Sequence, residues 1–177
     1  VDEIVRLLVA DHGSSIPPEL PAGGLRMPHG VREAIRERLR PLSTPCRDAV
    51  TCAAVIGQQF ELPCLQATAG LSHAALLAAL DEAEAAGLLV RTATLHGPYR
   101  FTHALIRDTL YDDLAAVERS GRHRQVGEAI EQLNRDNPGA HLAEMAHHFL
   151  MALPSGNSAA AVDYATRAAQ QAVSILA

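Results

Sequence analysis

The most distinctive chemical group in this sequence is the histidine at position 103, because of where the surrounding pattern places it. Residues 99–102 alternate as a strand does, and a helical pattern through Leu105 and Ile106 follows at once. His103 therefore stands at a predicted helix start, where unpaired backbone N–H groups favour an anion and an imidazole adds a further hydrogen bond. This combination indicates a phosphate contact. The alternative is a histidine that caps the helix or closes the edge of the core.

A second set of potential ligands follows a helical spacing near the C-terminus. His141, Glu144 and His148 are three and four residues apart, so one helix face would carry all three, as metal ligands on a helix do. No second pair of ligands is visible, and the opposite stripe through Met145 and Phe149 is apolar. A helix with one apolar stripe needs a polar face in any case. We therefore interpret the three residues as that polar face and expect no metal site.

The positive charge of the chain consists of arginine alone, since none of the 15 basic residues is a lysine. This excludes a P-loop lysine, a Schiff-base lysine and a catalytic ammonium within the chain. No glycine pattern of a nucleophile elbow accompanies the serines and histidines. We therefore expect no enzymatic activity and name no catalytic residue.

One predicted helix and its surroundings hold the only concentration of positive charge. It consists of Arg32, Arg36, Arg38, Arg40 and Arg47. Such a face suits docking to a nucleotide-binding domain, or an arginine near its nucleotide. The alternative is a solvated helix face on which Glu33 and Glu37 pair with the arginines. We favour this alternative because a run of exposed charged residues is usually no more than a solvent-facing surface.

The composition predicts a mainly α protein of 177 residues that is 48% hydrophobic, with 32 alanines, 23 leucines and only 3% aromatic residues. The three cysteines, Cys46, Cys52 and Cys64, form no C-x-x-C motif. They are expected as core residues of a protein in the reducing cytoplasm. No apolar run reaches the length of a membrane span, and no signal peptide opens the chain. We therefore expect no membrane association.

Breaker residues divide the chain into three parts. Residues 1–10 resemble the end of a helix, residues 11–30 are rich in Gly and Pro, and a helix is expected at about 31–41. Because the sequence begins partway through a helical pattern and without Met, we expect a piece of a longer protein. The first part, residues 1–42, is therefore interpreted as the end of a preceding domain and a linker.

In the second part, residues 43–116, residues that cap or end helices occur at regular intervals. Ser43 or Thr44 is expected to cap a helix that ends at Gly57, and a short extended piece at Phe60 follows. A second helix opens at Pro63, and a third runs from Ser72 to Gly87. Strands at 88–94 and 99–102 and a helix from about 103 complete the series. This order, with its β-hairpin, predicts a winged helix.

The third part, residues 117–177, is expected to be entirely helical. Helices are predicted at 117–134, 140–152 and 157–176, separated by segments that contain Pro and Gly. A stripe of alanines, Ala161, Ala165, Ala168 and Ala172, would allow close approach of a partner helix. An antiparallel pair of this length predicts the start of a solenoid that resembles tetratricopeptide repeats.

Four segments in this order resemble a known family. They are residues 28–39, 53–60, 99–108 and 141–149 (PHGVREAIRERL, AAVIGQQF, YRFTHALIRD and HLAEMAHHF). They are similar to the large ATP-binding transcriptional regulators of the LuxR type in bacteria and to ATPases fused to cyclase or kinase domains. Both groups belong to the signal-transduction ATPases with numerous domains (STAND).

The resemblance implies a domain order and a role for His103. In the family an ATPase domain precedes a winged helix and a sensor solenoid, so residues 1–42 would include the end of the ATPase lid. The Walker motifs would lie outside this chain, and ATP or ADP would bind the parent protein. Residues 102–108 are similar to an M-H-D segment whose histidine contacts the β-phosphate of ADP, with Ala104 standing where those relatives have Asp.

The resemblance implies a regulatory fragment that relays nucleotide state between an ATPase domain and a solenoid that senses a ligand or protein. The alternative is a free-standing DNA-binding winged helix. Its third helix would carry Asp81, Glu82 and Glu84 and no arginine, and the net charge is −5, so we expect no direct DNA binding. We also expect weak self-association through residues 140–177, because the last helices would have an apolar face that the next repeat of a solenoid normally covers.

Overall fold

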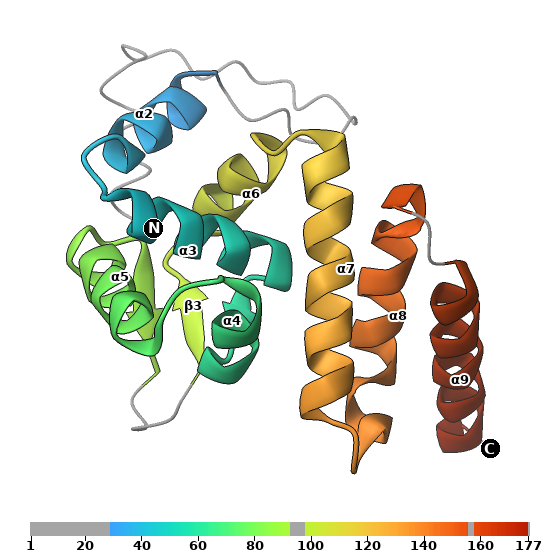
Figure 1. Cartoon of the computed structure of the whole chain (residues 1–177). Coiled ribbons are helices and arrows are strands. Elements are labelled where there is room, and N and C mark those ends of the chain that lie inside the picture. Colours follow the sequence, from blue (N-terminus) through green and yellow to red (C-terminus); the bar gives the residue numbers. More distant parts are fainter. Residues whose placement is uncertain (1–28, 93–97, 156–157, 177) are drawn as a thin grey trace. The chain divides into compact units, whose positions relative to one another are not determined.

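The computed structural model describes residues 29–92, 98–155 and 158–176 (Figure 1). The chain divides into two units, residues 1–41 and 42–177, and each is described by itself. The described part of the first unit is helix α2 (His29–Leu39), close to the expected 31–41. The helix end and linker expected over residues 1–28 lie outside the described residues.

The second unit begins with an α/β part whose element order agrees with the sequence-based expectation. Its elements are α3 (Thr44–Ile56), β1 (Gln59–Phe60), α4 (Leu62–Thr68), α5 (His73–Ala85), β2 (Leu89–Arg91), β3 (Tyr99–Phe101) and α6 (Ala104–Asp112). The three strands form one antiparallel sheet in the order β1-β3-β2. The hairpin strands are shorter than predicted from the sequence, and residues 93 and 94 of the predicted first strand lie outside the described residues.

Helix ends in this part are set by local signals. The Ser43 and Ser72 side chains accept hydrogen bonds from the backbone N–H groups of Cys46 and Ala75, at 3.2 and 3.3 Å. Each cap satisfies a backbone donor that the first turn of a helix leaves without a partner. Gly87 follows α5 with a φ of +68°, a left-handed conformation that glycine adopts without strain.

The core of the α/β part is built on α3, whose buried side chains are mainly Cys, Ala and Val. The sheet adds a small aromatic cluster, in which the Phe60 and Tyr99 rings stack at 5.8 Å and Phe101 lies at 6.0 Å from Phe60. The sheet thereby supplies the large side chains that an alanine-rich helix lacks. Cys46, Cys52 and Cys64 are all buried free thiols, as expected for core residues.

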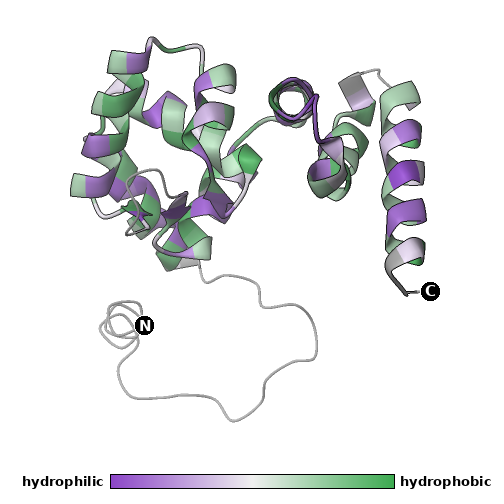
Figure 2. Cartoon of the chain, turned by 90° about the horizontal axis from the view of Figure 1, so that it is seen from below, coloured by the Kyte–Doolittle hydropathy of each residue, from purple (hydrophilic) through white to green (hydrophobic). Residues whose placement is uncertain are grey.

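The remaining chain is helical, as predicted from its sequence. Its elements are α7 (Ala116–Leu133), the 3₁₀ turn η1 (Pro138–His141), α8 (Leu142–Met151), the 3₁₀ turn η2 (Leu153–Ser155) and α9 (Ser158–Leu176). These helices lie side by side in sequence order (Figures 1 and 2). The helix predicted at 140–152 starts later, because Pro138 opens a tight 3₁₀ turn that passes into α8 at Leu142.

Aromatic and small residues join the three helices. The Phe149 ring of α8 stacks on the Tyr164 ring of α9 at 5.3 Å, and Ala161 is buried beside them. Gly127 lets α7 approach Phe149 closely: a Cβ placed at this glycine would lie 3.1 Å from the ring. The predicted alanine stripe is only partly covered, since Ala172 is exposed.

Candidate functional site

His103 is the N-cap residue of α6, directly after the end of β3, which confirms the predicted strand-to-helix position. Its backbone is extended (φ −139°, ψ 138°), and its half-buried side chain makes no capping hydrogen bond to the helix. The Thr102 side chain donates a 2.8 Å hydrogen bond to the Gly87 carbonyl and so fixes the strand just before the histidine. The imidazole therefore stands at a helix start without serving as its cap.

One turn further along α6, Arg107 fastens this helix to α3. Its Nε donates a hydrogen bond to the Ala54 carbonyl at 2.8 Å, and its Nη1 lies 3.2 Å from Asp108 Oδ1. The guanidinium also lies over the Tyr111 ring, 4.5 Å from the centroid, and Arg119 of α7 lies over the same ring at 4.9 Å. Cation–π contacts of this kind hold the start of α7 against α6.

Tyr111 is the outer end of a buried hydrogen-bonded chain that sequence analysis did not predict. Its hydroxyl lies 2.8 Å from His123 Nε2, and His123 Nδ1 lies 2.9 Å from His148 Nδ1. His148 also hydrogen-bonds the backbone of Ile56, at the end of α3. Both imidazoles are inaccessible, with exposed fractions of 0% for His123 and 1% for His148.

The facing ring nitrogens limit where the protons in this chain lie. The two Nδ1 atoms face each other at hydrogen-bond distance, so one of them carries a proton and the other accepts it. The other ring nitrogen of His123, Nε2, faces the Tyr111 hydroxyl. Every member is satisfied with both imidazoles neutral.

Burial keeps the two histidines neutral. Desolvation, assisted by His147, Arg107 and Arg119, lowers the pKa of His123 to about 4. Desolvation and then the neighbouring His123 and His147 lower the pKa of His148 to about 3. The chain joins α6, α7, α8 and the end of α3, which are the elements at the junction between the α/β part and the helical part.

The stripe of His141, Glu144 and His148 is not a shared polar face, and that part of the prediction was wrong. His141 Nδ1 and Glu144 Oε2 form an exposed pair at 3.1 Å, whereas His148 is buried against His123. Among the residues that the structure describes, no group of three His, Cys, Asp or Glu side chains is placed to hold a metal ion.

The basic concentration is divided between the two units. Arg36 and Arg40 pair with Glu33 and Glu37 on α2, at 3.5 and 2.8 Å, as a solvated helix face does. Arg32 and Arg38 are also on α2 and have partners of their own. Arg47 belongs to the other unit, as an exposed residue of α3.

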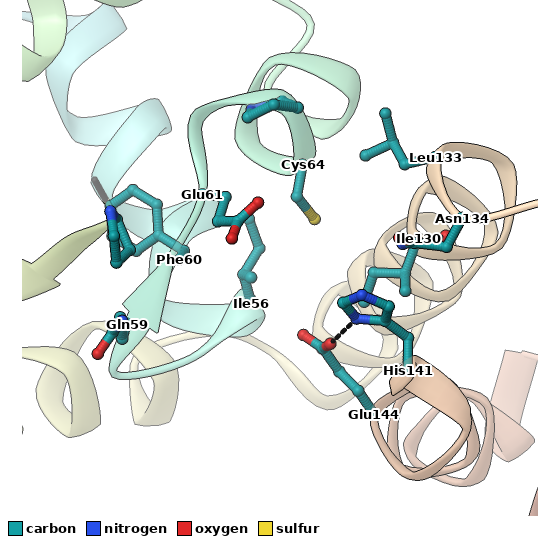
Figure 3. A pocket seen from close by; sticks show the side chains of 12 residues that line it. Ile56, Gln59, Phe60, Glu61, Cys64, Ile130, Leu133, Asn134, His141 and Glu144 are labelled. Carbon is teal, nitrogen blue, oxygen red and sulfur yellow. Dashed lines mark hydrogen bonds and ion pairs between the residues drawn. The ribbon is translucent and has the colours of Figure 1, made fainter. Parts of the chain in front are cut away.

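A cavity of about 490 Å³ opens where the segment from β1 to α4 faces the segment from α7 to α8 (Figure 3). Glu61, Cys64 and the paired His141 and Glu144 border it. Burial, with the negative charge of Glu144 and Glu61, raises the pKa of the Cys64 thiol to about 12. Cys64 therefore stays a neutral thiol and is a poor nucleophile and a poor metal ligand.

Comparisons with protein-family models, with curated proteins and with solved structures found no significant match. No single helix in the described part of the chain is long and apolar enough to cross a membrane. The test is met there only by α4 and α5 taken together, and these two helices are bent by 117° at the break between them.

Proposed function

We propose that the chain is a non-catalytic relay module of a bacterial ATP-dependent regulator of the STAND type. In this proposal residues 43–116 are a winged helix and residues 117–177 begin a solenoid that resembles tetratricopeptide repeats. The partners are the parent protein's own ATPase domain upstream and the rest of its solenoid downstream, and the setting is the cytoplasm. The output is transcription, or a fused cyclase or kinase domain.

The observation that carries the proposal is the placement of His103. It stands between β3 and the first turn of α6 with its imidazole uninvolved in capping, and α6 has nine residues. A helix start of this kind presents backbone N–H groups to an anion, and an imidazole beside them adds one more donor. This is the arrangement that a contact with an ADP phosphate in the parent protein requires.

The buried histidine chain gives the relay a physical route. His103 opens α6, and Tyr111 near the end of the same helix bonds His123 of α7, which bonds His148 of α8. A displacement of α6 must therefore move α7 and α8 or break a fully satisfied buried network, which is costly. A change at the phosphate contact would in this way reach the solenoid.

The competing role, direct DNA binding, is disfavoured by the helix that would enter the major groove. On α5, Glu82 accepts hydrogen bonds from the backbone and hydroxyl of Ser43, at 2.7 and 2.6 Å. Arg91 of β2 lies 3.7 Å from Asp81 and 3.5 Å from Glu84, so one of the two arginines of the hairpin, Arg91 and Arg100, neutralises acidic groups of the protein itself. Phosphate contacts need positive charge that this face does not offer.

The test is ADP retention in the full-length parent protein. His103→Ala should lower the amount of ADP that co-purifies and raise basal output, since a charge-assisted phosphate contact is worth about 1.5–3 kcal/mol, tenfold or more in affinity. The matched control is His73→Ala. His73 is an exposed histidine in the first turn of α5, bonded to Gln66 at 3.0 Å, and its loss should leave both readouts unchanged.

Two results would contradict the proposal. If His103→Ala retains the ADP content and basal output of the wild type, His103 is a structural residue of the strand-to-helix junction. If His73→Ala reproduces the effect of His103→Ala, the loss of ADP reflects general destabilisation.

A further inference from the structure

The cavity beside Cys64 has the dimensions of a small-molecule site. Its volume of about 490 Å³ falls within the range of roughly 300–1,000 Å³ that ligand sites occupy. Segments distant in sequence build it, chiefly the residues from the end of α3 to α4, the C-terminal end of α7, and the residues around the start of α8. Figure 3 shows Glu61 and Cys64 on one side of the space and His141 and Glu144 on the other.

The charge in this cavity is negative. Glu61 and Glu144 both lie close enough to Cys64 to raise the pKa of its thiol. None of its 12 lining residues is an arginine, and the one basic side chain among them, His141, is hydrogen-bonded to Glu144. The pairing occupies Glu144 Oε2, and the second carboxylate, Glu61, makes no capping hydrogen bond to α4. Such a cavity attracts cations and repels anions.

Most of the remaining lining is apolar, with Gln59 and Asn134 as the polar exceptions. Ile56 and Phe60 from the α/β part face Ile130 and Leu133 from α7. Leu133 is 48% exposed at the rim. Covering it would gain free energy from apolar surface removed from water.

We propose that this cavity binds a small organic cation with an apolar body, namely an amidinium, guanidinium or ammonium compound. The charged head lies near Glu61 and Glu144, and the body rests against the exposed Leu133 at the rim. A bound ligand would bridge the α/β part and the helical part, so its binding would favour one relative placement of the two. The binding itself is independent of the relay role proposed above.

The probe is benzamidine, whose amidinium is positively charged at neutral pH. Benzamide and benzoate have the same ring and a planar head of similar size, but they are neutral and negative. Each is titrated into the ¹⁵N-labelled chain, and backbone amide shifts are followed. Benzamidine should shift amides around Glu61, Cys64 and Leu133 with a dissociation constant on the order of 1 mM, as for a fragment of this size. Benzamide should bind more weakly, and benzoate should not bind.

The carboxylates are tested by neutral variants of the same shape. Glu61→Gln and Glu144→Gln should each weaken benzamidine binding on the order of threefold, and the double variant on the order of tenfold. Both side chains are exposed, so folding should be preserved. The matched control is Glu128→Gln on α7, an exposed glutamate outside the cavity, which should bind as the wild type does.

Three results would overturn the proposal. They are no shift around the cavity at 20 mM benzamidine, shifts by benzoate as large as those by benzamidine, and unchanged affinity in the double variant. None of them depends on ADP, so a failure here leaves the test at His103 intact, and a failure at His103 leaves this test intact.

Discussion

The Nδ1 atoms of His123 and His148 lie 2.9 Å apart in the interior of the protein. Two like nitrogens at this distance require one to carry a proton and the other to accept it, so the two imidazoles must hold different tautomers. The other ring nitrogen of His123 faces the Tyr111 hydroxyl, and His148 also hydrogen-bonds the Ile56 backbone. The hydrogen bond between the rings is lost when both are protonated, because two N–H groups then face each other.

The first prediction is that acid weakens the fold through these two histidines. An unfolded histidine has a pKa of about 6.5, whereas the folded values are about 4 for His123 and about 3 for His148. Below pH 6.5 these two histidines bind protons in the unfolded chain but stay neutral in the folded chain, so the free energy of unfolding falls as pH falls. Each residue contributes a slope of up to about 1.4 kcal/mol per pH unit. The loss between pH 7 and 5.5 should be about 2–3 kcal/mol, measured by urea denaturation.

The check on this assignment is an NMR titration of the histidine ring protons in the folded chain. The rings of His123 and His148 should not titrate above pH 5, while the exposed His73 serves as the comparison in the same spectrum. A midpoint near 6.5 for either buried ring would refute the neutral chain. His148→Leu should also reduce the slope of unfolding free energy with pH to about half, because one of the two titrating groups is gone.

The second prediction uses two glycines of α7 as a matched pair. A Cβ at Gly127 would meet three atoms of the Phe149 ring at 3.1–3.3 Å, and that ring is buried and stacked on Tyr164. A Cβ at Gly121 would meet nothing within 4 Å. Gly121→Ala should stabilise by about 0.5–1 kcal/mol through helix propensity. Gly127→Ala should lose about 1 kcal/mol or more, since overpacking outweighs that gain.

Urea denaturation of both variants measures this difference. The outcome that contradicts close packing of α7 on α8 is a Gly127→Ala variant more stable than the wild type. Tyr164→Ala should in turn relieve the cost of Gly127→Ala, because it frees the Phe149 ring to move. This dependence is measured as the coupling free energy of a double-mutant cycle.

The helix and strand order was predictable from the sequence because its determinants are local. Ser43 and Ser72 begin helices by accepting hydrogen bonds three residues along the chain, and Gly70 and Gly87 follow helices in the left-handed conformation. Such signals act within one turn and are visible in the sequence. The position of His103 at the start of α6 was found in the same way.

The buried chain and the cavity were not predictable, because both depend on residues far apart in the sequence. His123 and His148 are 25 residues apart, and helical periodicity placed His148 on the polar side of α8. Periodicity tells which residues share a face, but a polar residue on a buried face is allowed when another helix supplies its hydrogen-bond partner. Leu133 and Glu61 become neighbours of one cavity only through the packing of α7 near α4.

The third prediction is that the chain does not recognise a DNA sequence. The face of α5 presents Asp81 and Glu84, with side-chain exposed fractions of 72% and 28%, and Arg91 is engaged by both. An electrophoretic mobility shift at physiological salt should show no sequence-dependent complex, and any binding at low salt should vanish as salt rises. A complex that discriminates between sequences at physiological salt would favour the DNA-binding role over the relay.

The last prediction concerns the side of α9 that faces away from α8. Ala161 and Tyr164 are buried against the rest of the helical part, whereas Val162 and Val173 are 65% and 67% exposed. The exposed residues of this outer face recur at helical spacing as Val162, Thr166, Ala169 and Val173.

A solenoid helix buries such a face against the next repeat, and we expect the chain studied alone to cover it with a second copy. Sedimentation velocity should show a weak, concentration-dependent dimer.

Paired arginine substitutions test which face is used. Ala169→Arg puts a charge in the middle of the outer face and should abolish the dimer. Ser174→Arg adds the same charge to α9 off that face, where Ser174 is exposed, and should leave the dimer intact. A chain that stays monomeric at millimolar concentration would show that this face does not bind a second copy of the chain. A dimer that survives Ala169→Arg would place the contact elsewhere.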